Sequence, residues 1–156
     1  MKSFILSVLI STSAIMSVFA QSAENRKQNF LVTKGVALSG YDPVSYQSKN
    51  PQKGKASLSV NQNGIEYRFM NTENLEMFKK DPARYEPMYG GWCAYAMGKS
   101  GEKVEVDPEN YKLINGKLYL FYKSFLNNTL NSWNDDEPHL KKQADINWTK
   151  TIGKTN

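Results

Sequence analysis

The sequence has little of the chemistry on which most enzyme and metal sites depend. Among its 156 residues there is a single cysteine, Cys93, and a single histidine, His139. One cysteine excludes an internal disulfide framework and every multi-cysteine zinc pattern. One histidine excludes sites built on two or three histidines and leaves little material for a Ser-His or Cys-His catalytic pair. No motif therefore identifies a reaction.

Charge of one sign is not concentrated in any segment either. The chain has 20 Lys+Arg against 15 Asp+Glu, which gives a formal net charge of +5. The lysines are scattered along the sequence, and no block of five or six like charges occurs. This pattern is typical of a solvated surface rather than a nucleic-acid interface, so we expect no nucleic-acid partner.

The first twenty residues have the layout of a secretory signal peptide. Lys2 is their only charge, an apolar stretch follows, and small residues at Val18 and Ala20 precede Gln21. A retained membrane anchor is the alternative, but the apolar run is roughly 17 residues long and interrupted by hydroxyl side chains, which is marginal for a span. We predict a signal peptide at 1–20, and hence a periplasmic or secreted protein with no stable membrane anchor after cleavage.

Two β-hairpins are predicted from alternating apolar residues on either side of a turn. The first covers 56–70 around Asn63-Gly64, and the second covers 111–122 around Asn115-Gly116. Asn-Gly pairs accept the positive φ angles of tight hairpin turns, so both positions favour a two-residue connection.

The patterns of the remaining segments predict helices and flexible ends. The pattern is helical over 71–80 and again after the second hairpin, with a last helix from 138 to about 148. Residues 21–32 are polar and predict a flexible leader, and 150–156 predict a C-terminal tail. The sum is an α+β domain: a small antiparallel sheet built from hairpins, with helices packed on one side.

Two segments are more specific than composition. One is Gly40-Tyr-Asp-Pro-Val-Ser-Tyr46, and the other runs from Tyr67 through Asp81-Pro82 into Tyr89-Gly-Gly-Trp-Cys-Ala-Tyr95. Together they resemble the YHS domain, a short module related to the metal-sensing TRASH group. The similarity is greatest to exported, single-domain members, in which a "GKLYLxY"-like strand and an Ala-Asp-x-Asn-Trp tail follow the module. The resemblance spans residues 33–149.

The resemblance implies heavy-metal handling, but the residues that would do it are missing. In the family, cysteines follow an Asp-Pro-Val motif and occupy a Phe-Cys-Ser-x-x-Cys run. Here Ser45 follows the Asp-Pro-Val motif, and the second run is Phe69-Met70-Asn-Thr-Glu-Asn74. All three expected thiolates are absent, so the family's metal site is not carried over, and what remains is its scaffold.

Cys93 is the first candidate site residue. If the segment after it is helical, Cys93 and Met97 share a face, and Met70 occupies a position at which the family has cysteine. A thiolate with thioethers is a soft ligand set that suits Cu(I). The alternative is that Cys93 is a small buried hydrophobic residue and that the methionines fill gaps in the core.

A polar cluster is the second candidate. Tyr41, Asp42 and Tyr46, with Tyr89 beside a double glycine, offer flat aromatic walls and hydroxyl groups for a small ligand. The alternative is a simple turn, since Asp before Pro commonly opens one.

His139 is the third candidate, because the acidic residues 135–137 precede it. The four side chains could form a weak metal site, but acids at a helix N-terminus complement its dipole without any further role.

These observations favour an exported, non-catalytic YHS-like domain. We expect it to bind either a soft metal ion, namely copper, or a small ligand near Cys93. The alternative is an interaction or accessory domain of the cell envelope whose cysteine is structural. A third interpretation is a cysteine-dependent enzyme, which requires an accessible Cys93 thiol of low pKa.

Overall fold

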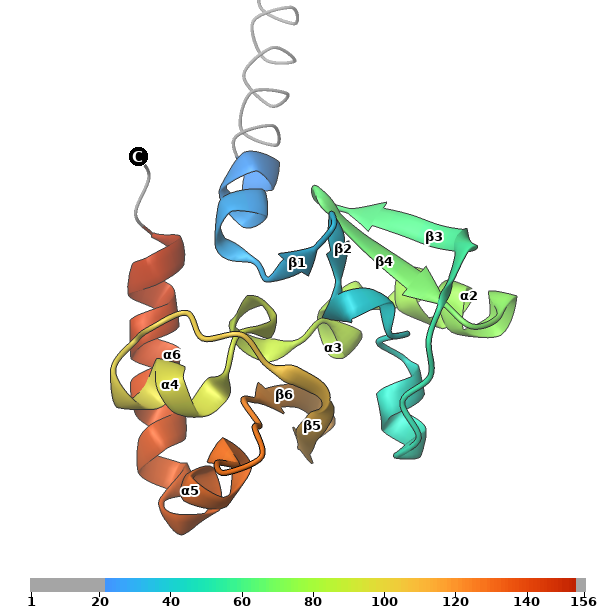
Figure 1. Cartoon of the computed structure of the whole chain (residues 1–156). Coiled ribbons are helices and arrows are strands. Elements are labelled where there is room, and N and C mark those ends of the chain that lie inside the picture. Colours follow the sequence, from blue (N-terminus) through green and yellow to red (C-terminus); the bar gives the residue numbers. More distant parts are fainter. Residues whose placement is uncertain (1–21, 154–156) are drawn as a thin grey trace, which may run out of the picture.

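A computed structural model describes residues 22–153 of the chain. The predicted signal peptide, residues 1–20, lies outside the described residues, as does the end of the predicted tail. The fold is α+β, as expected: it contains two small sheets and several helices (Figure 1). Within the described range, no helix combines the length and the hydropathy needed to cross a membrane.

The first sheet contains the first predicted hairpin. Its strands, in spatial order, are β1 (Val32–Thr33), β2 (Val36–Ala37), β4 (Ile65–Phe69) and β3 (Lys55–Gln62). β3 and β4 pair antiparallel across the Asn63-Gly64 turn, whereas β2 and β4 pair in parallel. The sheet is therefore mixed rather than purely antiparallel. After β2 the chain passes through residues 38–64, which include β3, before it forms β4 beside β2.

The second predicted hairpin forms a separate two-stranded sheet of β5 (Asp107–Ile114) and β6 (Lys117–Phe121). β6 alternates between two hydrophobic clusters: Leu118 and Leu120 pack in the first, and Tyr119 and Phe121 pack in the second. Successive side chains of a strand point to opposite faces. β6 is thus the central element, buried on both faces.

Helices form in the three predicted regions, although the one after the second hairpin begins only at Thr129, and two short helices precede that hairpin. The helices are α2 (Thr72–Lys80), α3 (Pro82–Tyr85), α4 (Ala94–Lys99), α5 (Thr129–Asp135) and α6 (Glu137–Ile152), with 3-10 turns at Leu38–Gly40, Ser45–Ser48 and Met88–Gly91. The Asn71 side chain caps α2 by accepting a hydrogen bond from the Asn74 amide at 2.8 Å. α6 continues to Ile152, so residues 150–152 belong to this helix and not to a tail.

The N-terminal segment differs from the prediction. Residues 22–29 form a helix, where the polar composition predicted a flexible leader. Arg26 forms an ion pair with Glu86 and lies 4.2 Å from the centre of the Phe30 ring. Phe30 in turn packs edge-on against Trp148, with ring centroids 5.9 Å apart. Contacts with residues distant in the sequence stabilise this helix. No pattern within residues 22–29 indicates these contacts.

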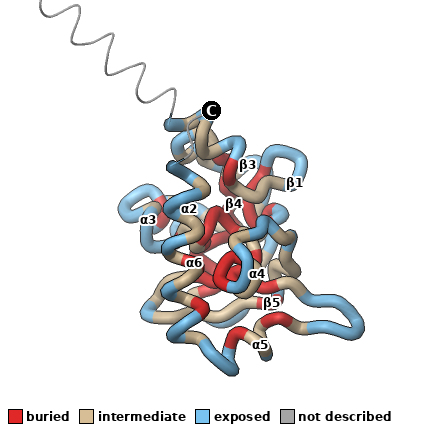
Figure 2. Tube along the Cα trace, turned by 90° about the vertical axis from the view of Figure 1, so that its left-hand side faces the viewer, coloured by how far each residue is buried: buried red, intermediate tan, exposed pale blue. Residues whose placement is uncertain are grey.

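The two hydrophobic clusters occupy opposite sides of β6. The first lies between the four-stranded sheet and α2 and is rich in packed aromatic rings, among them Tyr67, Phe69 and Phe78. The second lies under α4, α5 and α6 and is centred on Trp133. Figure 2 shows the buried residues running through the interior between the exposed helix and loop surfaces.

Candidate functional site

Cys93 is enclosed in the protein. It immediately precedes α4 and has a relative exposure of 0%. Its Sγ lies 3.4 Å from the Thr129 hydroxyl and accepts a hydrogen bond from the Tyr122 amide, also at 3.4 Å. The Thr129 hydroxyl donates to the Tyr122 carbonyl at 2.9 Å. The thiol thus joins the start of α4 to the end of β6 and the start of α5, which is a structural position.

The three sulfur residues of the copper prediction are not gathered at one place. Met97 is buried one helical turn after Cys93, and its amide donates to the Cys93 carbonyl at 3.0 Å. Met70 instead lines a surface cavity of about 320 Å³ together with Met77, a cavity to which Cys93 does not contribute. Residues 22–153 also hold no group of three His, Cys, Asp or Glu side chains placed to bind a metal ion. The three predicted sulfur ligands therefore do not line one common cavity of the described chain.

Asp42 is a hydrogen-bonding centre of the fold. Its carboxylate is 0% exposed. Oδ1 accepts from the Val44 amide at 2.8 Å, and Oδ2 accepts from the Met70 amide at 2.9 Å and from Asn74 Nδ2 at 2.7 Å. A buried carboxylate is tolerated when donors surround it. Asp42 thereby ties the turn before Ser45–Ser48 to the end of β4 and to α2, and its lone pairs are directed at the protein itself.

Tyr41 and Tyr46 lie beside Asp42, as predicted, but their hydroxyl groups also bind within the chain. Tyr41 donates to Glu109 Oε1 at 2.6 Å, and this hydrogen bond to a carboxylate raises the pKa of Tyr41 to about 12. Lys53 Nζ lies 3.9 Å from the centre of the Tyr41 ring. Tyr46 is buried and donates to the Pro108 carbonyl at 2.9 Å, and burial raises its pKa.

Tyr89 belongs to the other side of the molecule. It is buried in the second cluster, where its hydroxyl donates to Asp145 Oδ1 on α6 at 2.9 Å. Its ring meets Tyr119 edge-on at 5.8 Å, and burial, followed by the hydrogen bond to Asp145, raises its pKa. The predicted ligand cluster therefore divides: three of its four residues meet, and Tyr89 does not join them.

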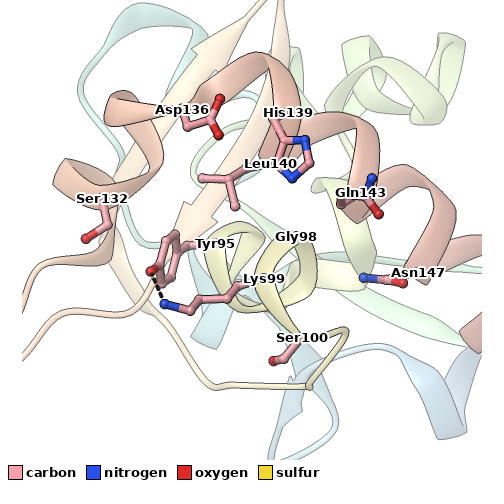
Figure 3. A pocket seen from close by; sticks show the side chains of 10 residues that line it. All are labelled: Tyr95, Gly98, Lys99, Ser100, Ser132, Asp136, His139, Leu140, Gln143 and Asn147. Carbon is pink, nitrogen blue, oxygen red and sulfur yellow. Dashed lines mark hydrogen bonds between the residues drawn. The ribbon is translucent and has the colours of Figure 1, made fainter.

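A cavity that the sequence did not reveal lies between α4, α5 and α6. Its volume is about 620 Å³, within the range of small-molecule sites. The lining residues, shown in Figure 3, are Tyr95, Gly98, Lys99, Ser100, Ser132, Asp136, His139, Leu140, Gln143 and Asn147. Most of them are polar, so the cavity suits a polar ligand.

The cavity follows from a close crossing of two helices. A Cβ atom on Gly98 of α4 would lie 2.5 Å from the Leu140 carbonyl oxygen of α6, so only glycine permits this approach. Asn147 Nδ2 also donates to the Met97 carbonyl at 2.8 Å and joins the two helices. Polar residues on α6 recur at intervals of three and four from Asp136 to Asn147, which places them on the face toward α4. That spacing is the one sequence signal that could have indicated the cavity.

The charges at the rim of the cavity are of opposite sign. Lys99 donates to the Tyr95 hydroxyl at 3.2 Å, and Asp136 begins the turn into α6. Neither forms an ion pair with any residue of the described part of the chain. Figure 3 shows the His139 ring directed into the space between the helices. The cavity therefore offers a polar ligand one cationic and one anionic side chain at its rim.

The acidic run before His139 serves mostly the helix itself. Glu137 lies in the first turn of α6 and accepts from Lys112 Nζ at 2.5 Å and from Trp133 Nε1 at 2.9 Å. The hydrogen bond from Lys112 is the largest reason that the pKa of Glu137 is lowered. This agrees with the helix N-terminus interpretation, whereas Asp136 and His139 take part in the cavity.

Comparison of the chain with protein-family models, with curated proteins and with solved structures finds no match.

Proposed function

We propose that the protein is an exported, non-catalytic domain of YHS type that binds a small zwitterionic molecule, of the size of a free amino acid, in the cavity between α4, α5 and α6. The observation that carries the proposal is the pair of rim charges, Lys99 and Asp136, which no other described side chain neutralises. The YHS assignment rests on the sequence resemblance over residues 33–149, and export rests on the pattern of residues 1–20.

The environment of Cys93 supports a binding role over catalysis. A nucleophilic thiol must meet its substrate and must ionise easily. Cys93 is fully buried and accepts a hydrogen bond from a backbone amide, and it does not line the cavity that His139 faces. A role for Cys93 in packing accounts for these contacts.

The shape of the cavity supports a small and polar ligand. Half-buried hydrogen-bonding groups, Tyr95, Gln143 and Asn147, line its interior, and the exposed charges stand at its rim. A carboxylate at Lys99 and an ammonium group at Asp136 would each gain a charge-assisted hydrogen bond. An uncharged polar molecule would gain neither.

Thermal unfolding of the full chain with a panel of free amino acids tests the proposal, with glucose as the uncharged comparison. A ligand present at ten times its Kd stabilises the folded state by about 1.4 kcal/mol, and this raises Tm. We expect at least one amino acid to raise Tm, and Lys99→Gln to abolish the rise. Lys80→Gln, at the exposed end of α2, is the matched control and should keep it. If no amino acid raises Tm, or if Lys99→Gln responds like Lys80→Gln, the proposal is wrong.

A further inference from the structure

The loop between β6 and α5 presents two large apolar side chains to solvent. Phe125 and Leu126 have relative exposures of 101% and 90%, the highest among the exposed large hydrophobic residues of the described chain. The others, such as Met77 at 39%, are partly covered. Side chains so far out of the protein make no contribution to its core, and two adjacent ones form a compact apolar tip.

The loop that carries this tip is held firmly at its base. Lys123 and Asn128 pair as an antiparallel bridge, and the Ser124 amide donates to the Asn127 carbonyl at 2.7 Å. Buried Asn110 donates from Nδ2 to Asn128 Oδ1 at 2.9 Å. The hydrogen bonds fix both arms, so Phe125 and Leu126 project from a clamped turn.

The loop that carries the tip has one charged side chain. Lys123, at the base of the tip, is the only charged residue between positions 120 and 130, and Asp107 lies on the neighbouring strand opposite Phe121. The whole chain carries a formal net charge of +5. Polar, uncharged Ser124 and Asn127 flank the two apolar residues. An apolar tip with a basic and amide-rich base matches the layers of an anionic lipid surface, in which acyl chains lie beneath charged headgroups.

We propose that Phe125 and Leu126 insert into the surface of membranes that contain anionic phospholipid, and that Lys123 interacts with the headgroups. A protein partner is less well matched, because a stable protein interface buries about 800 Å² on each side, and the tip offers only two side chains. Shallow insertion of two side chains into a lipid surface does not require such a large buried area. A small apolar anchor binds weakly by itself, however, so electrostatic attraction to anionic headgroups must add to it. The proposal depends on the loop alone and is independent of the α4–α6 cavity.

A fluorescent label at the tip tests this directly in the full chain. Leu126→Cys introduces a thiol for an environment-sensitive nitrobenzoxadiazole dye, and buried Cys93 should remain unlabelled. Met77→Cys, labelled in the same way on α2, is the control for the dye. With vesicles of phosphatidylcholine and phosphatidylglycerol we expect a blue shift and a rise in emission at position 126 and none at 77. Vesicles of phosphatidylcholine alone should produce a much smaller change.

Two further variants separate insertion from attraction. Phe125→Ser in the labelled protein should weaken vesicle affinity about tenfold, because a buried phenyl ring is lost, and Lys123→Glu should weaken it for anionic vesicles only. Equal emission changes at 126 and 77, or a dye at 126 that stays in water, would overturn the proposal. A shift at 126 that depends on protein concentration without vesicles would also overturn it and would indicate self-association.

Discussion

Replacing the Asp42 carboxylate with an amide should destabilise the protein far more than the same change at an ordinary helix cap. Asp42 is buried and accepts hydrogen bonds from the Val44 and Met70 amides and from Asn74 Nδ2. An asparagine side chain in its place has one acceptor oxygen and one NH₂ group. Whichever way the amide is turned, at least one buried N–H then faces another donor.

The size of the effect follows from these three bonds. Turned for the best fit, the oxygen of the introduced amide keeps the two bonds that Oδ2 accepts and loses the bond from Val44. A hydrogen bond to a charged group contributes about 1.5–3 kcal/mol, and a buried donor left without a partner costs about 1–3 kcal/mol. These two costs describe the same lost contact, so they are not added together. The two remaining hydrogen bonds also become weaker, because their acceptor is no longer charged. We therefore expect Asp42→Asn to lose about 2–4 kcal/mol of unfolding free energy in total.

Urea unfolding followed by fluorescence measures the change in the free energy of unfolding. Asp81→Asn is the matched control, because Asp81 is exposed and caps α3 through the Arg84 amide at 3.3 Å. Asn and Asp cap helices about equally well, so the control should lose only a few tenths of a kcal/mol. If Asp42→Asn loses less than about 1 kcal/mol, the three hydrogen bonds do not stabilise the fold as the structure indicates.

Three further predictions concern the reactivity of the Cys93 thiol, the stability of the fold at alkaline pH and the contact between α4 and α6. Cys93 should resist iodoacetamide in the folded protein and react after unfolding, and labelling of the native state would contradict its burial. Because the pKa of Tyr41 is raised to about 12 by its hydrogen bond to Glu109, that bond stabilises the fold fully below pH 10 and is lost as the pH rises through the folded pKa. Tyr41→Phe should therefore lose unfolding free energy less steeply than the wild type in alkaline urea titrations, and identical slopes would contradict this. Gly98→Ala places a methyl group against the Leu140 carbonyl and should cost about 1–3 kcal/mol of unfolding free energy, so an unchanged urea midpoint would show that the helices separate freely.

Local sequence signals predicted the elements of the fold well. The Asn-Gly turns identified both hairpins, and the helical pattern over 71–80 agrees with α2, which the Asn71 side chain caps. These features depend on a few consecutive residues, so the sequence alone contains them. The division into two sheets depends on the pairing of β2 with β4, which brings distant segments together.

The N-terminal helix shows where such signals fail. Its residues are polar and lack an apolar period, so nothing local distinguishes it from a leader. Arg26 reaches Glu86, sixty positions later, and Asn29 accepts a hydrogen bond from Lys103 Nζ at 2.8 Å. Tertiary contacts of this kind decide whether a polar helix forms.

The candidate site was predictable only in part. Cys93 and Met97 do lie one helical turn apart, but Met70 follows β4 and is held toward Asp42. Asp42 was predicted to belong to a ligand-binding cluster, with a simple turn as the alternative, and the hydrogen bonds that its carboxylate accepts come from the protein itself. The α4–α6 cavity depends on the contact of Gly98 with Leu140, between helices separated by a hairpin. The spacing of polar residues along α6 indicates one wall of the cavity, but it does not reveal that contact.

The central claim is that a small zwitterion binds between α4, α5 and α6, and amide NMR spectra test it most directly. Spectra of the ¹⁵N-labelled full chain would be recorded with and without the amino acid that raises Tm most. We predict saturable shifts confined to the cavity, at Lys99, Ser100, Gln143 and Asn147, and none around Asp42. Shifts that do not saturate, or that cluster around Asp42 instead, would contradict the account.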